Sequence, residues 1–420
     1  MSLSKELSAR GFIYQYSTES IEEIFDGPSR VVYLGIDPTA DSMHVGHLVP
    51  YMMLNHIMRH GHSVIALLGG GTALIGDPSF KNKEREVAAV DTIKTQCVGL
   101  EKNIRAITTS DQIQFVNNYD WLTELNAIEF LRDVGKYFTV NSMIKKDSVS
   151  RRFQEESGIS YTEFSYSLLQ AYDFYHLHTT YGCDVQIGGS DQWGNIIAGV
   201  DYVRRRTGQS AYAVTMPLIT DRATGKKFGK SEGNAVWLDA DKTTPYQFYQ
   251  FWLQTSDESV VDYLKLFTFL PLTEIADIEA AHRQDPARRI AQITLAKTVT
   301  SFVHGDTVAE SVARVSAVLF GSEDMSLLDG EDMSVVVANA PYYTVSPDIT
   351  IVDLLVSIDL ASSKREARTF VTQGAVMVDG VVVDSTDSPI GIVSAGRYSL
   401  VKRGKKRVAV VDMGDRSHLV

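Results

Sequence analysis

Apolar and polar positions along the first half of the chain follow two periods. Short runs rich in β-branched and aromatic residues are typical of strands, whereas longer stretches with apolar residues three and four positions apart are typical of amphipathic helices. The predicted strands are residues 30–37, 63–70, 113–118, 183–189 and 211–217. Their alternation with helices predicts an α/β domain with a doubly wound parallel sheet over residues 1–220. Ligands of such sheets bind at the carboxyl ends of the strands.

The second half of the chain has a different pattern. Residues 244–320 contain no predicted strand and are expected to form an all-helical domain. Residues 321–346 contain five acidic residues, no lysine or arginine and little periodicity, which predicts a mobile acidic linker. Residues 347–420 predict a small α+β domain, in which two short helices precede a β-turn-β unit at Asp379-Gly380.

Composition narrows the class of protein. The 420 residues are 44% hydrophobic and 22% charged, as in soluble globular proteins of two or three domains. No apolar run reaches the roughly 18 residues of a membrane span, and the first residues do not resemble a targeting peptide. Only Cys97 and Cys183 are present, without metal-type spacing, so we expect a reducing, cytoplasmic location. The net charge of -12 argues against indiscriminate nucleic-acid binding, and we expect neither a membrane nor DNA as a partner.

A histidine pair opens the helix that is predicted after the first strand, in the stretch ADSMHVGHLVP. Asp41 or Ser42 is the expected N-cap, which places His44 and His47 on one face of the first turn. Backbone N–H groups and the helix dipole favour an anion there, and Gly46 allows a ligand close to the backbone, so the motif predicts phosphate binding. A zinc site would need a third ligand and usually a spacing of four. By itself, the pair is more simply interpreted as ordinary surface or core histidines.

A lysine-bearing segment, TDRATGKKFGKSEGN at residues 220–234, follows the last predicted strand. Lys226, Lys227 and Lys230 lie in a glycine-containing loop of a kind that can surround a polyphosphate. The segment does not complete a P-loop, because the first glycine of that motif would have to stand at Thr224. Taken alone, it fits an exposed charged loop equally well.

Together, HVGH after the first strand and KFGKS after the last resemble the two signature motifs of class I aminoacyl-tRNA synthetases, whose catalytic domain is Rossmann-like. The segments YLGIDPTADSMHVGHL, IGDPS, YTEFSYSLLQAYDF and QIGGSDQWGNI look like binding segments of the bacterial tyrosyl-tRNA synthetase family. The similarity covers nearly the whole chain, and the tail resembles an RNA-binding fold of a ribosomal small-subunit protein. Val45, Phe228 and Gly229 depart from the wider class pattern of isoleucine, methionine and serine, but the imidazole and ammonium groups remain.

The resemblance implies a ligase that activates tyrosine with ATP, releasing pyrophosphate, and then transfers the tyrosyl group to the 3′ end of its tRNA. ATP is expected as a substrate with Mg²⁺, without a tightly bound cofactor and without a protein metal ligand. His44 and His47 would donate to phosphate oxygens, while Lys227 and Lys230, in a catalytic loop and connection over 221–243, would hold the departing pyrophosphate. The further catalytic residues that the resemblance implies are Thr39, Lys81 and Arg85.

One predicted helix carries the selectivity for the amino acid. Tyr166, Gln170 and Asp173 are spaced by four and three and share a face, although such a stripe is more often structural. By resemblance, Tyr33 and Asp173 hold the phenol, and Asp77, Tyr166 and Gln170 hold the ammonium group. The tyrosine-binding residues so implied are Tyr33, Asp77, Tyr166, Gln170, Asp173, Gln186 and Gln192. The implied ATP-binding residues are Gly35, Asp37, His44, Gly46, His47, Gly189, Asp191, Lys227, Phe228, Lys230 and Ser231.

Basic residues of the tail predict contacts with RNA phosphates, although charged surface runs are commonly only solvated. The candidate RNA-binding residues are Lys364, Arg365, Arg368, Lys402 and Arg403. The resemblance also implies a homodimer, with residues 119–150 as its interface, because this apolar segment interrupts the strand and helix alternation.

Three alternatives remain open at this level. A tryptophanyl-tRNA synthetase would share the fold, but Asp173 favours a phenol and the basic tail is unlike that relative. A nucleotidylyltransferase would share the histidine motif without needing tRNA. A pure RNA-binding module would leave the histidine and lysine motifs unexplained.

Overall fold

The computed structural model describes residues 1–79, 88–110, 112–146, 149–150, 158–220, 228–231, 234–321, 323, 325–394, 397–404 and 407–414, with only the backbone at 230, 231 and 234. The residues group by their contacts into two compact units. Unit 1 is Met1–Thr243 with Thr255–Leu295, and unit 2 is Thr244–Gln254 with Ala296–Val420. The helices that were predicted as one domain are thus shared between the units.

A six-stranded sheet, in the order β1-β6-β5-β2-β3-β4, organises unit 1. Its strands are β1 (Gln15–Tyr16), β2 (Val31–Ile36), β3 (Ser63–Leu68), β4 (Ile113–Asn117), β5 (Cys183–Gly189) and β6 (Tyr212–Met216). Neighbouring strands are parallel, except that β1 is antiparallel to β6. The five predicted strands are confirmed as β2 to β6. Strands β3 and β4 lie on one side of β2, whereas β5 and β6 lie on its other side. The strand order therefore reverses between β2 and β5.

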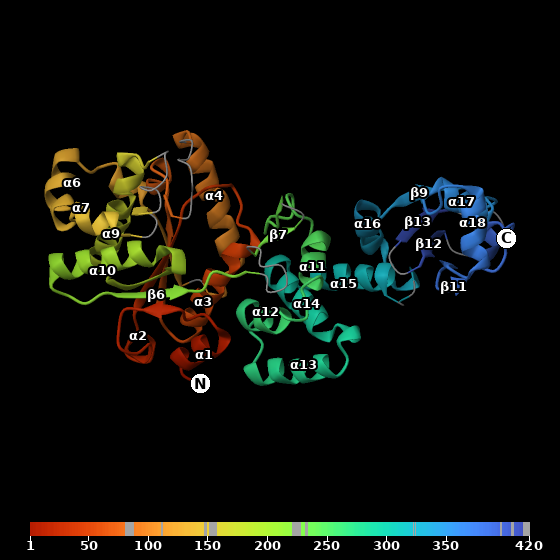
Figure 1. The fold of residues 1–420 in the computed structure, drawn as a ribbon, viewed down its shortest axis with the longest axis horizontal. Helices are drawn as coiled ribbons and strands as arrows, with labels where there is room; N and C mark the ends of the chain where they lie inside the picture. The colour runs from red at the N-terminus through yellow and green to blue at the C-terminus, as the bar shows by residue number, and fades with distance from the viewer. Residues whose placement is uncertain are drawn as a thin grey trace. The chain divides into compact units, whose positions relative to one another are not determined.

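Helices cover both faces of this sheet, as predicted for a doubly wound fold. In Figure 1, α3 (Leu48–Arg59) and α4 (Val90–Ala106) lie on one side, and α9 (Tyr161–Tyr181) and α10 (Trp193–Thr207) on the other. Helix α9 begins at Ser160, whose hydroxyl accepts the N–H of Glu163, and ends at Gly182, whose φ of 67° suits a residue without Cβ. No helix of the described ranges is both long and apolar enough to cross a membrane.

Most of the remaining elements of unit 1 are short. Between β4 and α9 lie α5 (Tyr119–Leu122), α6 (Ala127–Asp133), η3 (Gly135–Tyr137) and α7 (Val140–Ile144). Val134 and Met143 from this region pack on Leu168 of α9 and Tyr202 of α10. The rest comprises α1 (Leu3–Arg10), α2 (Glu22–Phe25), η1 (Val45–His47), η2 (Thr72–Leu74), η4 (Ser190–Gln192), β7 (Lys230–Ser231), β8 (Asn234–Ala235), α12 (Val260–Phe267), α13 (Leu272–Gln284) and η5 (Pro286–Arg288).

Unit 2 joins helices to a second sheet. Its helices are α11 (Pro245–Leu253), the latter part of α14 (Ile290–His304), α15 (Asp306–Phe320), η6 (Met325–Leu327), α16 (Gly330–Asn339), α17 (Ile351–Ser357), α18 (Lys364–Thr372) and α19 (Ile390–Val393). The sheet order is β11-β10-β12-β13-β9. Its strands are β9 (Tyr342–Thr344), β10 (Val376–Val378), β11 (Val381–Val382), β12 (Tyr398–Arg403) and β13 (Arg407–Asp412).

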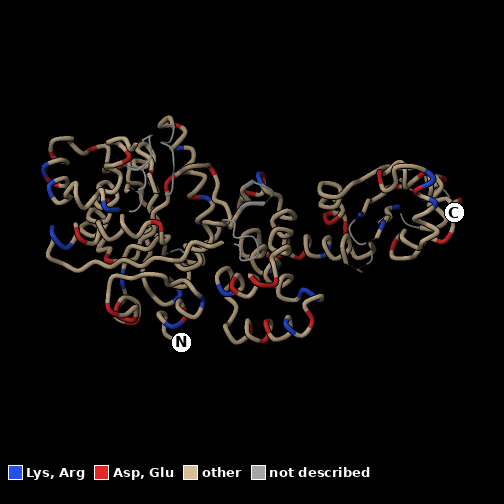
Figure 2. The backbone as a smooth tube through the Cα atoms, in the orientation of Figure 1, with Lys and Arg blue, Asp and Glu red and all other residues tan. Residues whose placement is uncertain are grey.

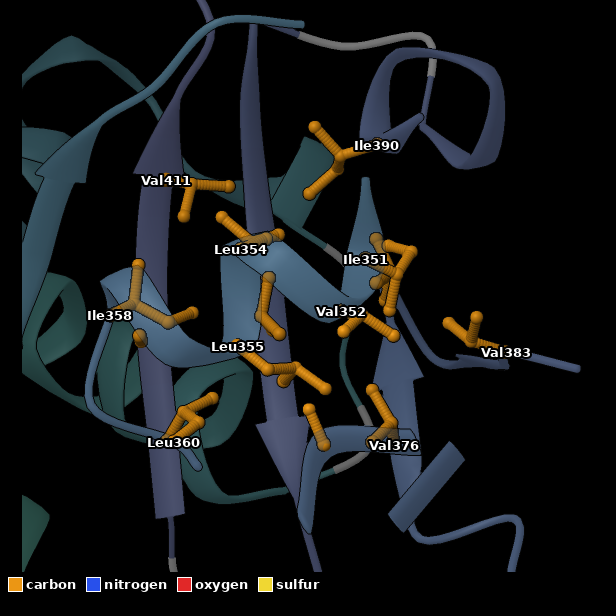
Figure 3. Packing of buried hydrophobic residues seen from close by; sticks show 14 of the residues in the cluster. Ile351, Val352, Leu354, Leu355, Ile358, Leu360, Val376, Val383, Ile390 and Val411 are labelled. Carbon is orange, nitrogen blue, oxygen red and sulfur yellow. The ribbon is translucent and has the colours of Figure 1, made fainter. Parts of the chain in front are cut away.

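The tail has its own apolar core (Figure 3). Ile351, Leu354 and Leu355 of α17 pack against sheet residues that include Val376 and Val411, and all five side chains are fully buried. The predicted β-turn-β unit is confirmed as β10 and β11, joined by Asp379 and Gly380 with φ values of 49° and 82°. Two successive positive φ values are what a tight hairpin turn needs, because they match the twist of the strands.

The prediction of a mobile acidic linker at residues 321–346 did not include a helix and a strand that the structure forms there, α16 and β9. Asp329 caps α16 and forms a reciprocal capping box with Asp332, so the acids start a helix. Arg314 and Ser311 of α15 bind Asp332, which is fully buried. Strand β9 pairs in parallel with β13 of the tail sheet. The acidic composition misled the prediction because the charges are neutralised by capping and by pairing with a distant arginine.

Candidate active site

A cavity of about 400 Å³ lies in unit 1 where the strand order reverses. Its walls come from the carboxyl ends of β2, β3 and β5, from the turns that follow them, and from one face of α9. A crevice forms at such a reversal because the connections of the adjacent strands leave on opposite faces of the sheet. The predicted site residues that line it are Tyr33, Gly35, Asp37, Thr39, His47, Asp77, Tyr166, Gln170, Asp173, Gln186, Gly189, Asp191 and Gln192.

The histidine pair stands at the edge of this cavity as a stacked unit. The rings of His44 and His47 are 3.9 Å apart between centroids and 22° from parallel. Nδ1 of His44 accepts the N–H of Gly46 at 3.1 Å, and Nδ1 of His47 accepts the N–H of His44 at 3.3 Å. These bonds place the proton of each neutral ring on Nε2, which makes Nε2 a donor.

The predicted N-cap was wrong. His44 itself caps the first turn, in a reciprocal arrangement with His47. Asp41 instead pairs with Lys242 at 2.6 Å, and the Ser42 hydroxyl donates to Asn103. A Cβ at Gly46 would lie 2.8 Å from Cε1 of His44, so glycine is required first to seat the ring of His44.

The described part of KFGKS, residues 228–231, lies beside the histidine motif. A Cβ at Gly229 would lie 3.2 Å from the backbone nitrogen of Gly46, so the two backbones are nearly in contact. Val45 donates its N–H to Val236 at 2.9 Å, and His44 forms a β-bridge with Trp237. The structure therefore brings the two signature motifs together although about 180 residues separate them.

At the closed end of the cavity, Asp173 is held by two donors. Its Oδ2 accepts from the Asn118 amide at 2.9 Å, and its Oδ1 accepts from the Trp121 indole at 2.8 Å. Burial raises the pKa of Asp173 to about 7, although these two hydrogen bonds act to lower it. Trp121 is itself seated by stacking on His176, with ring centroids 4.3 Å apart.

Sequence reasoning missed Asn118 and Trp121. Asn118 directly follows β4, and the carboxyl end of a parallel strand is where polar residues reach a site, so its position was a usable signal. Trp121 carried no comparable signal, because its contact with Asp173 depends on the packing of α5 against α9.

Three buried polar atoms around the cavity have no hydrogen-bond partner in the described structure: the Tyr33 hydroxyl, Gln170 Oε1 and Gln186 Oε1. Tyr33 and Gln186 are paired across β2 and β5, which brings both side chains to the same wall. Buried polar groups are nearly always satisfied, so their gathering here indicates a polar ligand.

Carboxylates concentrate midway along the cavity. Tyr166 donates its hydroxyl to Asp37 at 2.8 Å, and Gln192 donates its amide to Asp77 at 2.8 Å. Burial, followed by the charges of Asp37 and Asp77, raises the pKa of the Tyr166 phenol well above its ordinary value. The pair of Asp37 and Asp77 favours a cationic ligand group over an anionic one at this position.

The two glycines that end β5, Gly188 and Gly189, leave backbone open to a flat ligand. A Cβ at Gly189 would lie 2.4 Å from the Asp191 carboxylate, and one at Gly188 would lie 3.0 Å from Ile196. Side chains are therefore excluded from the strand end where Asp191 faces the cavity.

Several predicted residues remain untested. Lys81, Arg85 and Lys227 lie outside the described residues, as do the side chains of Lys230 and Ser231. Phe228 is 8% exposed and packs its ring in a core, so only its backbone is placed to meet a nucleotide.

The basic residues of the tail divide into two groups. Lys364, Arg365 and Arg368 are exposed on α18, with Lys364 paired to Asp353 at 2.6 Å. Lys402 instead donates to the carbonyls of Val318 and Gly321, and Arg403 donates to the carbonyl of Leu360. Acidic and basic residues are interspersed along the chain (Figure 2). The basic residues on the exposed face of α18 are therefore a local cluster.

Comparison with known proteins identifies the family of both parts of the chain. A family model described as tRNA synthetases class I (W and Y) matches residues 27–321, and one for the tyrosine--tRNA ligase SYY-like C-terminal domain matches residues 332–411. The second match starts within α16, consistent with the pairing of β9 in the tail sheet.

The relatives cover nearly the full length. "Tyrosine--tRNA ligase 2" of Enterococcus faecalis is 47% identical over 96% of this chain and 97% of its own. "Tyrosine--tRNA ligase" of Chromobacterium violaceum is 46% identical over 98% of both chains. A C-terminally truncated mitochondrial tyrosyl-tRNA synthetase of Aspergillus nidulans superposes with a TM-score of 0.70 at 33% identity, covering 76% of this chain and 94% of that one. This chain therefore belongs to the tyrosine--tRNA ligase family of class I aminoacyl-tRNA synthetases.

Proposed function

We propose that the cavity holds tyrosine and ATP together, so that the tyrosine carboxylate attacks the α-phosphate and the tyrosyl group then passes to the 3′ end of tRNA(Tyr). The observation that carries this proposal is the closed end of the cavity. There a fully buried carboxylate, Asp173, and the buried hydroxyl of Tyr33, which has no partner among the described residues, face a space lined by α9 and β2. A phenol satisfies both groups, because its hydroxyl donates to a carboxylate and accepts from a hydroxyl.

The middle of the cavity suits the amino and carboxylate groups of the same ligand. Asp77, Tyr166 and Gln170 offer acceptors for the ammonium group, and Asp37 reinforces them by accepting from Tyr166. Gln192 is positioned by Asp77 and Asn195 and is assigned to orient the reacting carboxylate. Gln186 is assigned to the wall of the cavity that contacts tyrosine. Positioning of this kind lowers the barrier because the reacting atoms no longer have to find each other.

The open side of the cavity is assigned to ATP. Gly35, Asp37, Gly189 and Asp191 border the space for the nucleoside, where two glycines let the ligand lie on the backbone. His44, His47 and Thr39, with Gly46 seating the rings, are assigned to the phosphates. Lys227, Lys230, Ser231 and the backbone of Phe228 would complete this side, with Lys81 and Arg85 as further contributors. Donors aimed at the α-phosphate stabilise the charge that develops there during attack.

Mg²⁺ is proposed to enter with ATP, held by phosphates and water. The described residues contain no group of three His, Cys, Asp or Glu side chains that could hold a metal ion. The cation would neutralise charge on the leaving pyrophosphate, and no tightly bound cofactor is proposed.

The tail is proposed to bind tRNA. In the proposed order along the chain, a catalytic domain and a helical domain precede this RNA-binding domain. Arg365 and Arg368 line a surface hollow on α18, and Lys364 lies beside them. Lys402 and Arg403 contribute less directly, because backbone carbonyls occupy their charged groups. An Arg368→Ala variant should raise the KM for tRNA and reduce its salt dependence while ATP-pyrophosphate exchange stays unchanged.

The chain is also proposed to form a homodimer and to be located in the cytoplasm. The segment at residues 119–150 exposes large apolar side chains, among them Ile128 at 72% and Val140 at 59%. Exposed apolar residues gathered on one segment are typical of an interface. Sedimentation of an Ile128→Asp variant tests this, since loss of the dimer is expected and an unchanged mass would contradict it.

ATP-pyrophosphate exchange with each amino acid in turn tests the proposed reaction. Exchange that requires tyrosine and proceeds without tRNA is expected. Exchange driven by tryptophan, or by an acceptor that is not an amino acid, would contradict the proposal.

A further inference from the structure

Arg10 ends helix α1 and reaches the end of another helix far along the chain. Its guanidinium donates to the carbonyls of Lys265 at 3.2 Å, Thr268 at 3.1 Å and Leu270 at 2.8 Å, and also to Glu6. Arg10 is 4% exposed; its bond to the Thr268 carbonyl is buried, and its other three bonds are partly buried. One buried cation thus binds the last turn of α12 and the chain that leaves it.

The C-terminal end of α12 depends on these donors. The last carbonyls of any helix lack partners within the helix, and a cation is favoured there by the helix dipole. The Thr268 hydroxyl satisfies the Leu264 carbonyl, and Arg10 satisfies that of Lys265. Without Arg10, carbonyls in a buried turn would lose their donor, and the turn would have to rearrange to reach water.

Helix α12 also carries the socket for the lysine-bearing segment. The ring of Phe228 packs against Tyr263 and Phe267, with centroid distances of 4.9 and 5.1 Å. Tyr263 and Phe267 are 4% and 1% exposed, so a shift of α12 moves the seat of Phe228. Cores transmit such shifts because they are closely packed.

Phe228 is followed by Gly229, whose backbone nearly touches that of Gly46 between the two histidines. The N–H of Val236 returns to the carbonyl of Gly229 at 3.2 Å, and the N–H of Phe228 binds the carbonyl of Ile219. The position of the segment relative to the histidine pair is therefore set from one side by α12 and from the other by the backbone of the first turn.

We propose that Arg10 is a positioning residue for the nucleotide step: by fixing the end of α12, it holds the socket of Phe228 and so the segment that contains Lys230 beside His44 and His47. Arg10 does not touch the substrates in this arrangement. The inference rests on the proposed role of the lysine-bearing segment in ATP binding and pyrophosphate release.

The test is the rate of tyrosyl-adenylate formation in single turnovers of the full chain with saturating tyrosine. Arg10→Ala should lower this rate roughly ten- to a hundredfold, as expected when a supporting residue misplaces groups by a fraction of an ångström. The Kd for tyrosine should stay within about twofold, because the closed end of the cavity does not depend on α12. Arg10→Lys, which keeps the charge and can reach one carbonyl, should recover part of the rate.

Arg30 provides a matched control. It also donates to helix-end carbonyls, those of Ile24 and Glu23, and pairs with Asp184, but it serves α2 rather than α12. Arg30→Ala should lower the thermal midpoint much as Arg10→Ala does and leave adenylate formation unchanged. Equal rates of adenylate formation in Arg10→Ala and Arg30→Ala would overturn the inference. A loss of tyrosine affinity in Arg10→Ala as large as its loss in rate would also overturn it.

A double-mutant cycle tests the route. If Arg10 acts through the socket, the total loss in rate of the Arg10→Ala, Phe228→Leu double variant should be smaller than the product of the two separate losses. Independent, multiplicative losses would reject this route. A wild-type chain without tyrosine-dependent exchange would contradict the proposed function itself, whereas an active wild type with an unaffected Arg10→Ala would contradict only the role of Arg10.

Discussion

The two ends of the cavity are built on different principles. The end proposed for the amino acid is enclosed by side chains, with Asp173 fully buried and fixed by two donors. The end proposed for the nucleotide is built largely from backbone: His44 and His47 accept backbone N–H groups, and Gly229 lies against Gly46. The first end fits one chemical group of a ligand, whereas the second presents a series of hydrogen-bond donors.

On the proposed assignment, this difference separates selectivity from rate. A buried carboxylate and hydroxyl would reject a ligand that lacks a phenol, because such a ligand would leave both groups unpaired. Donors on an open backbone discriminate little between anions, but they are effective where negative charge grows during the reaction. Changes at the amino-acid end should therefore alter tyrosine affinity, and changes at the nucleotide end should alter the rate of adenylate formation.

The largest effect is expected from His47→Ala. Loss of one donor to the α-phosphate should slow adenylate formation by about 10² to 10³, with the Kd for tyrosine unchanged. Stopped-flow or quenched-flow single turnovers measure the rate, and equilibrium dialysis measures the Kd. A parallel loss of tyrosine affinity would show that the two ends are not separate.

Gly46→Ala should come next, with a loss of about 10² in the same rate. The new Cβ would lie 2.8 Å from the ring of His44 and must displace it from its stack on His47. Gly27→Ala is the control, because a Cβ at Gly27 meets nothing within 4 Å. If both variants keep the wild-type rate, the stacked arrangement is not needed for the reaction.

Asp173→Asn should act at the other end. The loss of a charged acceptor for the phenol should weaken tyrosine binding roughly 10- to 100-fold, since hydrogen bonds to charged groups contribute about 1.5 to 3 kcal/mol. The ratio of tyrosine to phenylalanine activation in ATP-pyrophosphate exchange should fall by a similar factor. An unchanged ratio would remove Asp173 from the selectivity of the site.

The smallest effect is a shift in pH dependence. Because burial raises the pKa of Asp173 to about 7, the carboxyl group is protonated below that pH and becomes a weaker, uncharged acceptor for a phenol. Tyrosine affinity should therefore rise with pH up to about 7 and then level off. Trp121→Phe removes a hydrogen bond that lowers this pKa, so the midpoint should move to higher pH.

The Kd for tyrosine measured between pH 6 and 9 in both proteins checks the shift. His47→Ala serves as the control, since its midpoint should match that of the wild type. A midpoint that moves with His47 and not with Trp121 would assign the titration to the nucleotide end.

Much of the fold could be predicted because its signals are local. The strands from β2 to β6 and helix α9 follow from period, caps and glycine stops, and the hairpin at Asp379-Gly380 follows from the turn chemistry of those two residues. Errors arose where distant residues decide the outcome. Asp329 caps α16, and Asp332 anchors this helix to Arg314. His44, which forms a β-bridge with Trp237, takes the place of the expected caps.

The sequence by itself determined the types of the main elements, the family and most of the side chains around the cavity, because side-chain period and motif order are properties of neighbouring residues. Only the tertiary structure decided which distant residues these side chains and helices bind. Asn118 and Trp121 donate to Asp173, Arg10 donates to carbonyls at the end of α12, and Lys402 donates to backbone carbonyls. The reason is physical. Burial and hydrogen bonding between distant segments set the ionisation of Asp173 and the placement of the lysine-bearing segment, and no local pattern contains those distances.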